Sequence, residues 1–216
     1  MIDKNTKLRI FTSFFLIFLF YLFFKFNLIL VYTLLIFGVL SILEFLHLFN
    51  KIFTNKFYRY ILNIIFIIYI SFFCYFFIFL SNFYQFKLII CSILVGCIAS
   101  DIGGFVFGKT FKGPKLISIS PNKTVFGSIG SLIFTCLAFS ASMFVSLSQF
   151  NYKIVIISLI ISIACQLGDL FISYLKRKAN VKDTGNILPG HGGILDRIDG
   201  ILLGVPFGLI SLVVIY

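Results

Sequence analysis

The segment from Tyr60 to Leu80, YILNIIFIIYISFFCYFFIFL, decides the fold, because it is free of charge over a length that suits a membrane-crossing helix. Similar segments recur along the 216 residues, of which 60% are hydrophobic and 12% charged, with a mean hydropathy of +1.11. This composition excludes an ordinary soluble domain. The segments predict about seven transmembrane helices, at 8–24, 27–43, 60–80, 88–107, 125–148, 154–175 and 199–216.

The predicted fold class is therefore all-α, a polytopic integral membrane protein with one domain over 1–216. Its N-terminal spans occupy 8–80, and two polar loops belong to the half from about 88 to 216. Only Lys25, Phe26 and Asn27 lie at the junction of the first two segments, so a re-entrant hairpin would give the same pattern. No small-residue cleavage site follows Phe24, which favours a retained anchor over a signal peptide.

Basic residues gather on one predicted side of the membrane. The chain has 18 Lys and Arg against seven Asp and Glu. All but three of the basic residues precede the first span or follow the second, fourth and sixth spans, and the three exceptions are Lys25, Lys87 and Lys153. By the positive-inside rule, the N-terminus and these connections lie in the cytoplasm. A simpler alternative is that the charges only orient the protein and bind anionic headgroups.

Acidic residues gather on the same side, which matters because an unpaired carboxylate within a membrane costs several kcal/mol. Six of them lie at cytoplasmic span ends or in cytoplasmic loops: Glu44, Asp101, Asp169, Asp183, Asp196 and Asp199. On a helix, Gln166, Asp169, Ser173 and Lys176 or Arg177 form one polar stripe. This stripe predicts a cavity or a partner helix, and hydrogen bonding between helices alone would also explain it.

The segment PGHGG, residues 189–193, is a glycine-rich loop that can approach a phosphate closely. It leads directly into Asp196, Arg197 and Asp199 at the start of the last span. These two carboxylates, with Asp169, make an oxygen-ligand set suited to Mg²⁺ and substrate phosphates. The nearby basic residues Lys176, Arg177, Lys178, Lys182 and Arg197 would neutralise a polyphosphate. The cluster predicts phosphoryl or nucleotidyl transfer at the membrane surface.

A second polar segment runs from Ser100 to Gly127. Residues 103–110 match the P-loop pattern G-x-x-x-x-G-K-[ST], but they end an apolar span instead of joining a strand to a helix, so we reject a P-loop. Ser120, Lys123 and Thr124 are predicted to supply phosphate contacts from this cytoplasmic loop. Glu44 and His47 have the E-x-x-H spacing of di-iron proteins, yet a second copy is missing. His191 has no Cys or second His nearby, which favours a phosphate contact over zinc.

Together these motifs resemble the phosphatidate cytidylyltransferase (CDP-diacylglycerol synthase) family. The resemblance rests on SYLKRKANVKDTGNILPGHGGILDRID (173–199), on GDL before Ser173, on SPNKT (120–124), on SDIGGFVFGK (100–109) and on Glu44-Phe45. It implies a multi-span enzyme, commonly a homodimer, that makes CDP-diacylglycerol and pyrophosphate from CTP and phosphatidate. It also implies a multi-pass cell-membrane location with cytoplasmic active-site loops, and no nucleic acid partner.

The resemblance also implies roles for single residues. Asp169 and Asp196 would bind Mg²⁺, with room for a second cation, monovalent or divalent. The catalytic set would be Asp169, Asp196, Lys176, Arg177 and Asp199. Substrate contacts would come from Ser173, Lys182, Asp183, His191, Gly192, Gly193, Arg197, Ser120, Lys123, Thr124 and Asp101. The chain departs from the family pattern at Phe126, where an acidic residue is frequent, and at Gly200, where serine is frequent.

Three other functions fit parts of the pattern. A CTP-dependent polyprenol or phytol kinase would carry similar Lys- and Asp-containing loops, but the full P-G-H-G-G-x-x-D-R-x-D run argues against it. An anion transporter should place its charges near the bilayer midplane and between internal repeats, whereas these charges gather at one face. A family member that binds lipid without catalysis remains the third alternative.

Overall fold

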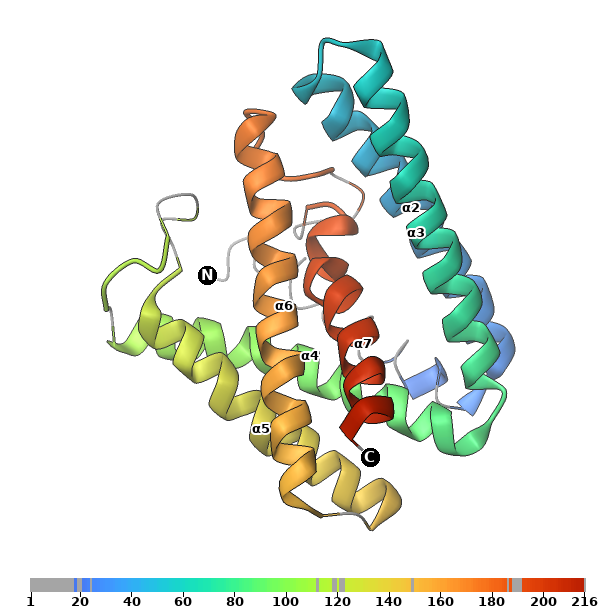
Figure 1. The fold of residues 1–216 in the computed structure, drawn as a ribbon, viewed down its shortest axis with the longest axis vertical. Coiled ribbons are helices and arrows are strands. Elements are labelled where there is room, and N and C mark those ends of the chain that lie inside the picture. Colours follow the sequence, from blue (N-terminus) through green and yellow to red (C-terminus); the bar gives the residue numbers. More distant parts are fainter. Residues whose placement is uncertain are drawn as a thin grey trace, which may run out of the picture. The chain divides into compact units, whose positions relative to one another are not determined.

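A computed structural model describes residues 18, 21–23, 25–111, 113–117, 120, 123–148, 150–185, 187 and 192–215. The long helices of these residues are α2 (Asn27–Ile52), α3 (Lys56–Ser81), α4 (Tyr84–Phe111), α5 (Val125–Leu147), α6 (Tyr152–Lys178) and α7 (Leu195–Ile215) (Figure 1). All six are long and apolar enough to cross a membrane. They confirm the all-α polytopic fold and six of the predicted spans. Most of the predicted span 8–24 lies outside the described residues.

Polar residues next to the apolar runs set the helix ends. The side chains of Asn55 and Thr124 accept hydrogen bonds from backbone amides in the first turns of α3 and α5, at 2.9 and 3.1 Å. Ser148 (φ 52°) and Asn180 (φ 52°) adopt the left-handed conformation just after α5 and α6. The helices therefore extend a few residues beyond most of the apolar segments.

The chain divides into two compact units, and each is described by itself. The first contains residues 1–83 and 175–197, with α2 and α3 as an antiparallel pair (Figure 1). The rings of Phe45 and Phe66 stack with centroids 3.5 Å apart, which joins α2 to α3. A Cβ at Gly38 would lie 3.0 Å from Cys74 Sγ, so glycine allows the close approach of the two helices.

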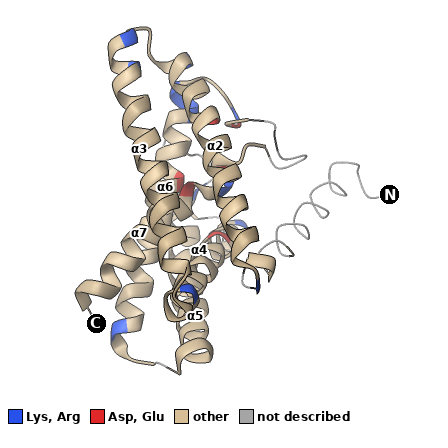
Figure 2. Ribbon diagram, turned by 90° about the vertical axis from the view of Figure 1, so that its right-hand side faces the viewer, with Lys and Arg blue, Asp and Glu red and all other residues tan. Residues whose placement is uncertain are grey.

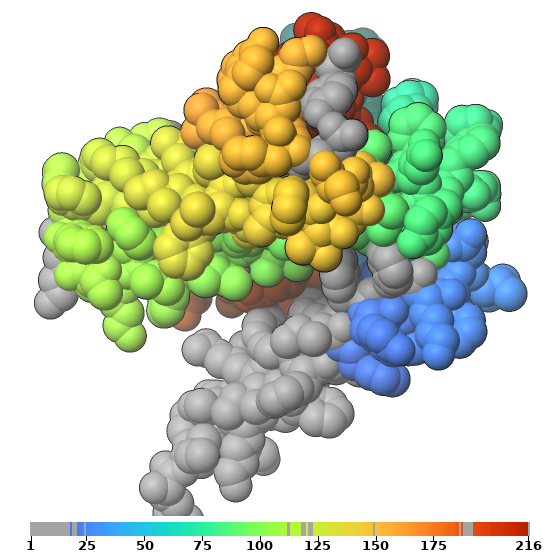
Figure 3. All heavy atoms as spheres, turned by 90° about the horizontal axis from the view of Figure 1, so that it is seen from below, coloured from blue at the N-terminus to red at the C-terminus, as the bar shows by residue number. Residues whose placement is uncertain are grey.

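The second unit contains residues 84–174 and 198–216. In it α4 and α5 lie side by side (Figures 1 and 3). Glycines line their contact, since a Cβ at Gly104 would lie 2.7 Å from Ser131 Oγ and a Cβ at Gly127 would lie 2.9 Å from the Gly104 carbonyl oxygen. The P-loop-like residues 103–110 are all helical within α4, which confirms the rejection of a phosphate-binding loop there.

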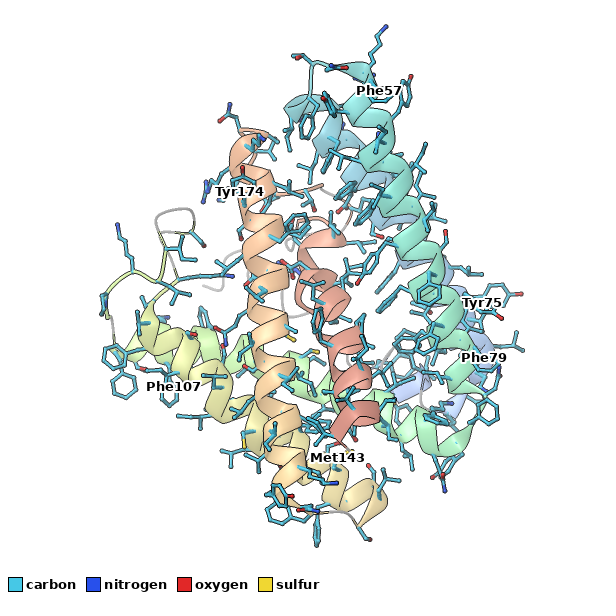
Figure 4. All side chains as sticks on the ribbon, in the orientation of Figure 1. Phe57, Tyr75, Phe79, Phe107, Met143 and Tyr174 are labelled. Atoms are coloured by element: carbon cyan, nitrogen blue, oxygen red, sulfur yellow. The ribbon has the colours of Figure 1, made fainter. Side chains whose placement is uncertain are left out.

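Large apolar side chains cover the outside of the helices, as expected of a protein surrounded by lipid. Tyr75 and Phe79 project outward from α3 (Figure 4), and their exposed fractions are 68% and 49%. Lysine and arginine are confined in α3 to its first turn, at Lys56 and Arg59 (Figure 2). The middle of such a helix offers lipid no charge to solvate.

Candidate functional site

The loop between α6 and α7 is organised around the carboxylate of Asp196. Asp196 Oδ2 accepts hydrogen bonds from the Thr184 amide at 2.8 Å, the Thr184 hydroxyl at 3.0 Å and the Gly193 amide at 3.3 Å. Because Thr184 and Gly193 lie nine positions apart within this loop, one side chain joins two separate parts of it. Gly192 has φ +84°, a conformation that L side chains rarely adopt, and lies against Asp183 and Asp196.

The other oxygen of Asp196 pairs with Lys176. The distance from Lys176 Nζ to Asp196 Oδ1 is 2.7 Å, and the side chains are 18% and 7% exposed. Lys176 reaches this position because it lies in the last turn of α6, where the chain turns back at Asn180. Removing either partner of such a sheltered ion pair strongly destabilises the folded protein, because the remaining charge is left unpaired.

Glu44 lies beneath the same loop, and our sequence analysis did not predict it as a site residue. It comes from α2 and is only 5% exposed. Its Oε1 accepts the Ile194 amide at 2.9 Å, and its Oε2 accepts the Leu195 amide at 2.9 Å and the Thr184 hydroxyl at 2.7 Å. Glu44 therefore satisfies amides at the first residue of α7, where a negative charge also meets the positive end of the helix dipole.

In the second unit, Asp169 of α6 pairs with Lys123 of the loop before α5. Lys123 Nζ lies 2.5 Å from Asp169 Oδ2, and the two side chains are 24% and 35% exposed. Ser173 contacts Asp169 Oδ1 at 3.4 Å, one turn further along α6. Asp169, the one carboxylate of the polar stripe predicted on α6, thus has polar partners on both of its oxygens.

The loop before α5 folds back on itself to present Lys123. The Leu116 amide donates to the Lys123 carbonyl at 2.8 Å, and the Val125 amide donates to the Pro114 carbonyl at 3.0 Å. The Lys123 amide also donates to the Ser120 carbonyl at 3.1 Å. Ser120 and Thr124 thus appear here as parts of the loop's own turn and of the α5 cap.

Asp199 is buried near the start of α7, where α6 and α7 cross closely. A Cβ at Gly168 would collide with the Asp199 carbonyl oxygen, so only glycine fits there. By contrast, a Cβ at Gly200 would meet the Cys165 carbonyl oxygen at 3.4 Å, an ordinary contact. The other departure, Phe126, packs over Gly113 and Phe111.

The remaining predicted site residues lie near the surface or outside the residues that the structure describes. Arg177, Lys182, Asp183, Arg197 and Asp101 are exposed. His191 lies outside the described residues. Within the described part of the chain, no three His, Cys, Asp or Glu side chains come together as a metal cluster. The roles of these residues and the Mg²⁺ site stay predictions.

Two residues that hold the loop before α7 in place, Glu44 and Thr184, were not predicted as site residues from the sequence. The sequence did mark Glu44 as an acid at the edge of an apolar segment, which is a signal of function. Its spacing to His47 suggested a metal motif, which we rejected, and Glu44-Phe45 entered only the family resemblance. Nothing in the sequence shows that its partners lie about 140 to 151 positions away along the chain.

Comparison with known proteins confirms the family resemblance. The sequence model described as "Cytidylyltransferase family" matches residues 1–215. A protein of Rickettsia bellii named "Phosphatidate cytidylyltransferase" is 46% identical over 114 residues, which cover 49% of each chain. Proteins of the same name from Helicobacter pylori and Bacillus subtilis are 42% identical over 115 residues and 41% identical over 145 residues. These matches cover 52% and 65% of this chain, and 42% and 53% of the relatives. The matched segments thus span about half the length of the relatives.

Proposed function

The chain belongs to the cytidylyltransferase family, and from this membership we propose that it acts as a phosphatidate cytidylyltransferase in phospholipid biosynthesis. The observation that carries the proposal is the shared name of relatives that are 41% to 46% identical to it. The substrates would be CTP from the cytoplasm and phosphatidate from the membrane. The products would be CDP-diacylglycerol and pyrophosphate.

In the proposed reaction, a phosphate oxygen of phosphatidate attacks the α-phosphorus of CTP. A new P–O bond forms while the bond between the α-phosphorus and its bridging oxygen breaks, and pyrophosphate leaves with that electron pair. The phosphatidate oxygen is already ionised at neutral pH, so a strong general base is unnecessary. The main barrier is repulsion between anions, which cationic groups and correct alignment can lower.

The paired lysines suit this task. Lys176 and Lys123 each lie beside a carboxylate, at 2.7 and 2.5 Å, which orients each ammonium group. We propose that Arg177, Lys182, Arg197 and His191 add further contacts to the phosphates, with Ser173, Asp183, Gly192, Gly193 and Asp101 around them. A basic, glycine-containing loop at the membrane surface would then receive both the nucleotide and the lipid headgroup.

Mg²⁺ is the cofactor we propose, with Asp169 and Asp196 as its ligands. Their carboxylate oxygens are the ligand type that Mg²⁺ prefers, and each already holds a cationic ammonium group. When bound, the ion would neutralise charge on the triphosphate and the leaving group. Asp169 is the more open of the two, since its side chain is 35% exposed against 7% for Asp196.

Labelled CTP tests the reaction directly. Purified protein in micelles containing phosphatidate receives CTP labelled at the α- or the γ-phosphorus, with Mg²⁺ or EDTA. We expect α-label, and no γ-label, in the chloroform-extractable lipid. A lipid kinase would instead transfer the γ-label, when a polyprenol or phytol is supplied. Folded protein that transfers neither label would contradict the proposal.

Variants then test the residues. Asp169→Asn, Asp196→Asn and Lys176→Gln should each lower the initial rate by about 100-fold or more, because each removes a charge held at the proposed site. Lys153→Gln is the matched control for Lys176→Gln, since it removes a lysine from the first turn of the same helix, α6. Wild-type rates in both aspartate variants would remove Asp169 and Asp196 from the metal site.

A further inference from the structure

We infer that Glu44 is a positioning residue: it fixes the base of the loop between Thr184 and Leu195 and thereby holds Asp196 and Lys176 in their reactive orientation. This inference rests on the proposed function for its kinetic consequence. Glu44 is 5% exposed, and both of its carboxylate oxygens accept hydrogen bonds from the protein, so it acts through other residues and not on the substrate.

The contacts of Glu44 join both ends of the loop. The Thr184 hydroxyl comes from the start of the loop, and the Ile194 and Leu195 amides come from its end. All three donors lie within 2.7 to 2.9 Å of the two carboxylate oxygens. A helix from the N-terminal half of the chain thus clamps the loop that the sequence analysis singled out.

The three hydrogen-bond donors around Glu44 require a carboxylate. Three donors converge on two oxygens, and buried helix-end amides need an acceptor. A glutamine has nearly the same shape but only one acceptor oxygen, so its NH₂ group would face at least one of the donors. Glu44→Gln therefore changes hydrogen bonding and charge with little change in volume.

The backbone around Glu44 has room for this carboxylate and little else. A Cβ at Gly185 would lie 2.6 Å from Glu44 Oε1. A Cβ at Gly193 would collide with Glu44 Oε2 and with Thr184 Oγ1. Two glycines on the two sides of the loop thus leave the space that the carboxylate fills.

Thr184 transmits the position of Glu44 to Asp196. Its hydroxyl lies 2.7 Å from Glu44 Oε2 and 3.0 Å from Asp196 Oδ2, and its amide donates to Asp196 Oδ2 at 2.8 Å. Asp196 in turn holds the Lys176 ammonium through its other oxygen. Loosening Glu44 would therefore release the loop base from which Asp196 and Lys176 take their orientation.

The test compares four variants in detergent micelles: Glu44→Gln, Thr184→Val, Thr184→Ser and His47→Gln. We expect Glu44→Gln and Thr184→Val to lower kcat per folded molecule by about 10- to 100-fold, the usual effect of losing a supporting hydrogen bond behind a reactive group. The KM for CTP should change by less than about threefold, because the loss concerns orientation more than binding. Thr184→Ser keeps the hydroxyl and should retain kcat.

His47→Gln is the matched control, because His47 lies on α2 one turn beyond Glu44 and is exposed. It should leave kcat unchanged. A kcat for Glu44→Gln within twofold of wild type would overturn the inference. So would a Thr184→Ser variant as slow as Thr184→Val, since the hydroxyl would then not be the connecting group.

Hydrogen exchange separates this inference from the proposed function. In Glu44→Gln, the peptide containing the Ile194 and Leu195 amides should exchange faster by about tenfold or more, because both amides lose their acceptor. This measurement needs no catalysis. Failure of the wild-type protein to transfer label would refute the proposed function, whereas unchanged exchange in Glu44→Gln would refute the role of Glu44.

Discussion

At the scale of single residues, donors within the protein satisfy the carboxylates of the two polar sites. Asp196 has four donors within hydrogen-bond distance and Glu44 has three, and the two acids share the single proton of the Thr184 hydroxyl. Asp169 is held less tightly, by Lys123 and Ser173. Burial without such partners would cost several kcal/mol per charge, so the loop and its acids stabilise each other.

A substitution at Gly193 tests how closely the loop packs against Glu44 and Thr184. Gly193→Ala would place a methyl group against Thr184, Glu44 and the Gly185 amide nitrogen, the last at 2.7 Å. We expect it to lower the free energy of unfolding by about 1 to 3 kcal/mol, the usual effect of overpacking. Gly200→Ser is the control, because its Cβ would make only a 3.4 Å contact with Cys165. Denaturant unfolding in detergent measures both variants, and equal stabilities would argue against a tightly fitted loop.

At the scale of helices, the apolar segments predicted the number and order of the described spans well. The largest error was at the end of α2, predicted near residue 43 and observed at Ile52. The prediction stopped there because Glu44 and His47 interrupt the apolar run. Glu44 nevertheless lies inside the helix, since its charge is satisfied by residues far away in sequence. Local pattern carries no information about such distant partners.

The α6 stripe was predicted from its spacing, but its partners were not. Ser128 of α5 donates to Gln166 Oε1 at 2.5 Å, and Gln166 Nε2 contacts Ser162 Oγ at 3.3 Å. Lys123 precedes α5, and Asp169 follows Gln166 by one turn of α6. The contact between Ser128 and Gln166 therefore fixes the register of the two helices in which Lys123 meets Asp169.

A double-mutant cycle measures the contribution of that pair. Ser128→Ala and Gln166→Leu should together be less destabilising than the sum of the single variants, with a coupling of about 0.6 to 1.7 kcal/mol, typical of hydrogen bonds between membrane helices. Unfolding in mixed micelles provides the free energies. Ser211→Ala with Gln166→Leu is the control pair, because the Ser211 hydroxyl donates within its own helix to Gly208. Additive effects of Ser128→Ala and Gln166→Leu would show that the contact does not couple α5 to α6.

At the scale of the whole molecule, the helix ends agree with the charge pattern from which we predicted topology. The connections after α2, α4 and α6 carry clusters of Lys and Arg, whereas α4 and α6 begin near single lysines, Lys87 and Lys153. The acids and bases of both polar sites belong to the basic connections or the helix ends beside them. A nucleotide from the cytoplasm can reach the sites only if these connections face it.

Reporter fusions test that orientation. A fluorescent reporter fused after Lys115, between α4 and α5, should fold and emit, because we predict that this connection is cytoplasmic. An alkaline phosphatase fused after Asn151, between α5 and α6, should be active, because we predict that this connection faces the oxidising side. The opposite pattern would place Lys123, Lys176 and the loop before α7 outside the cell, away from CTP. The proposed reaction would then be impossible in the cell even if purified protein catalysed it, so topology constrains the function independently of the kinetic assay.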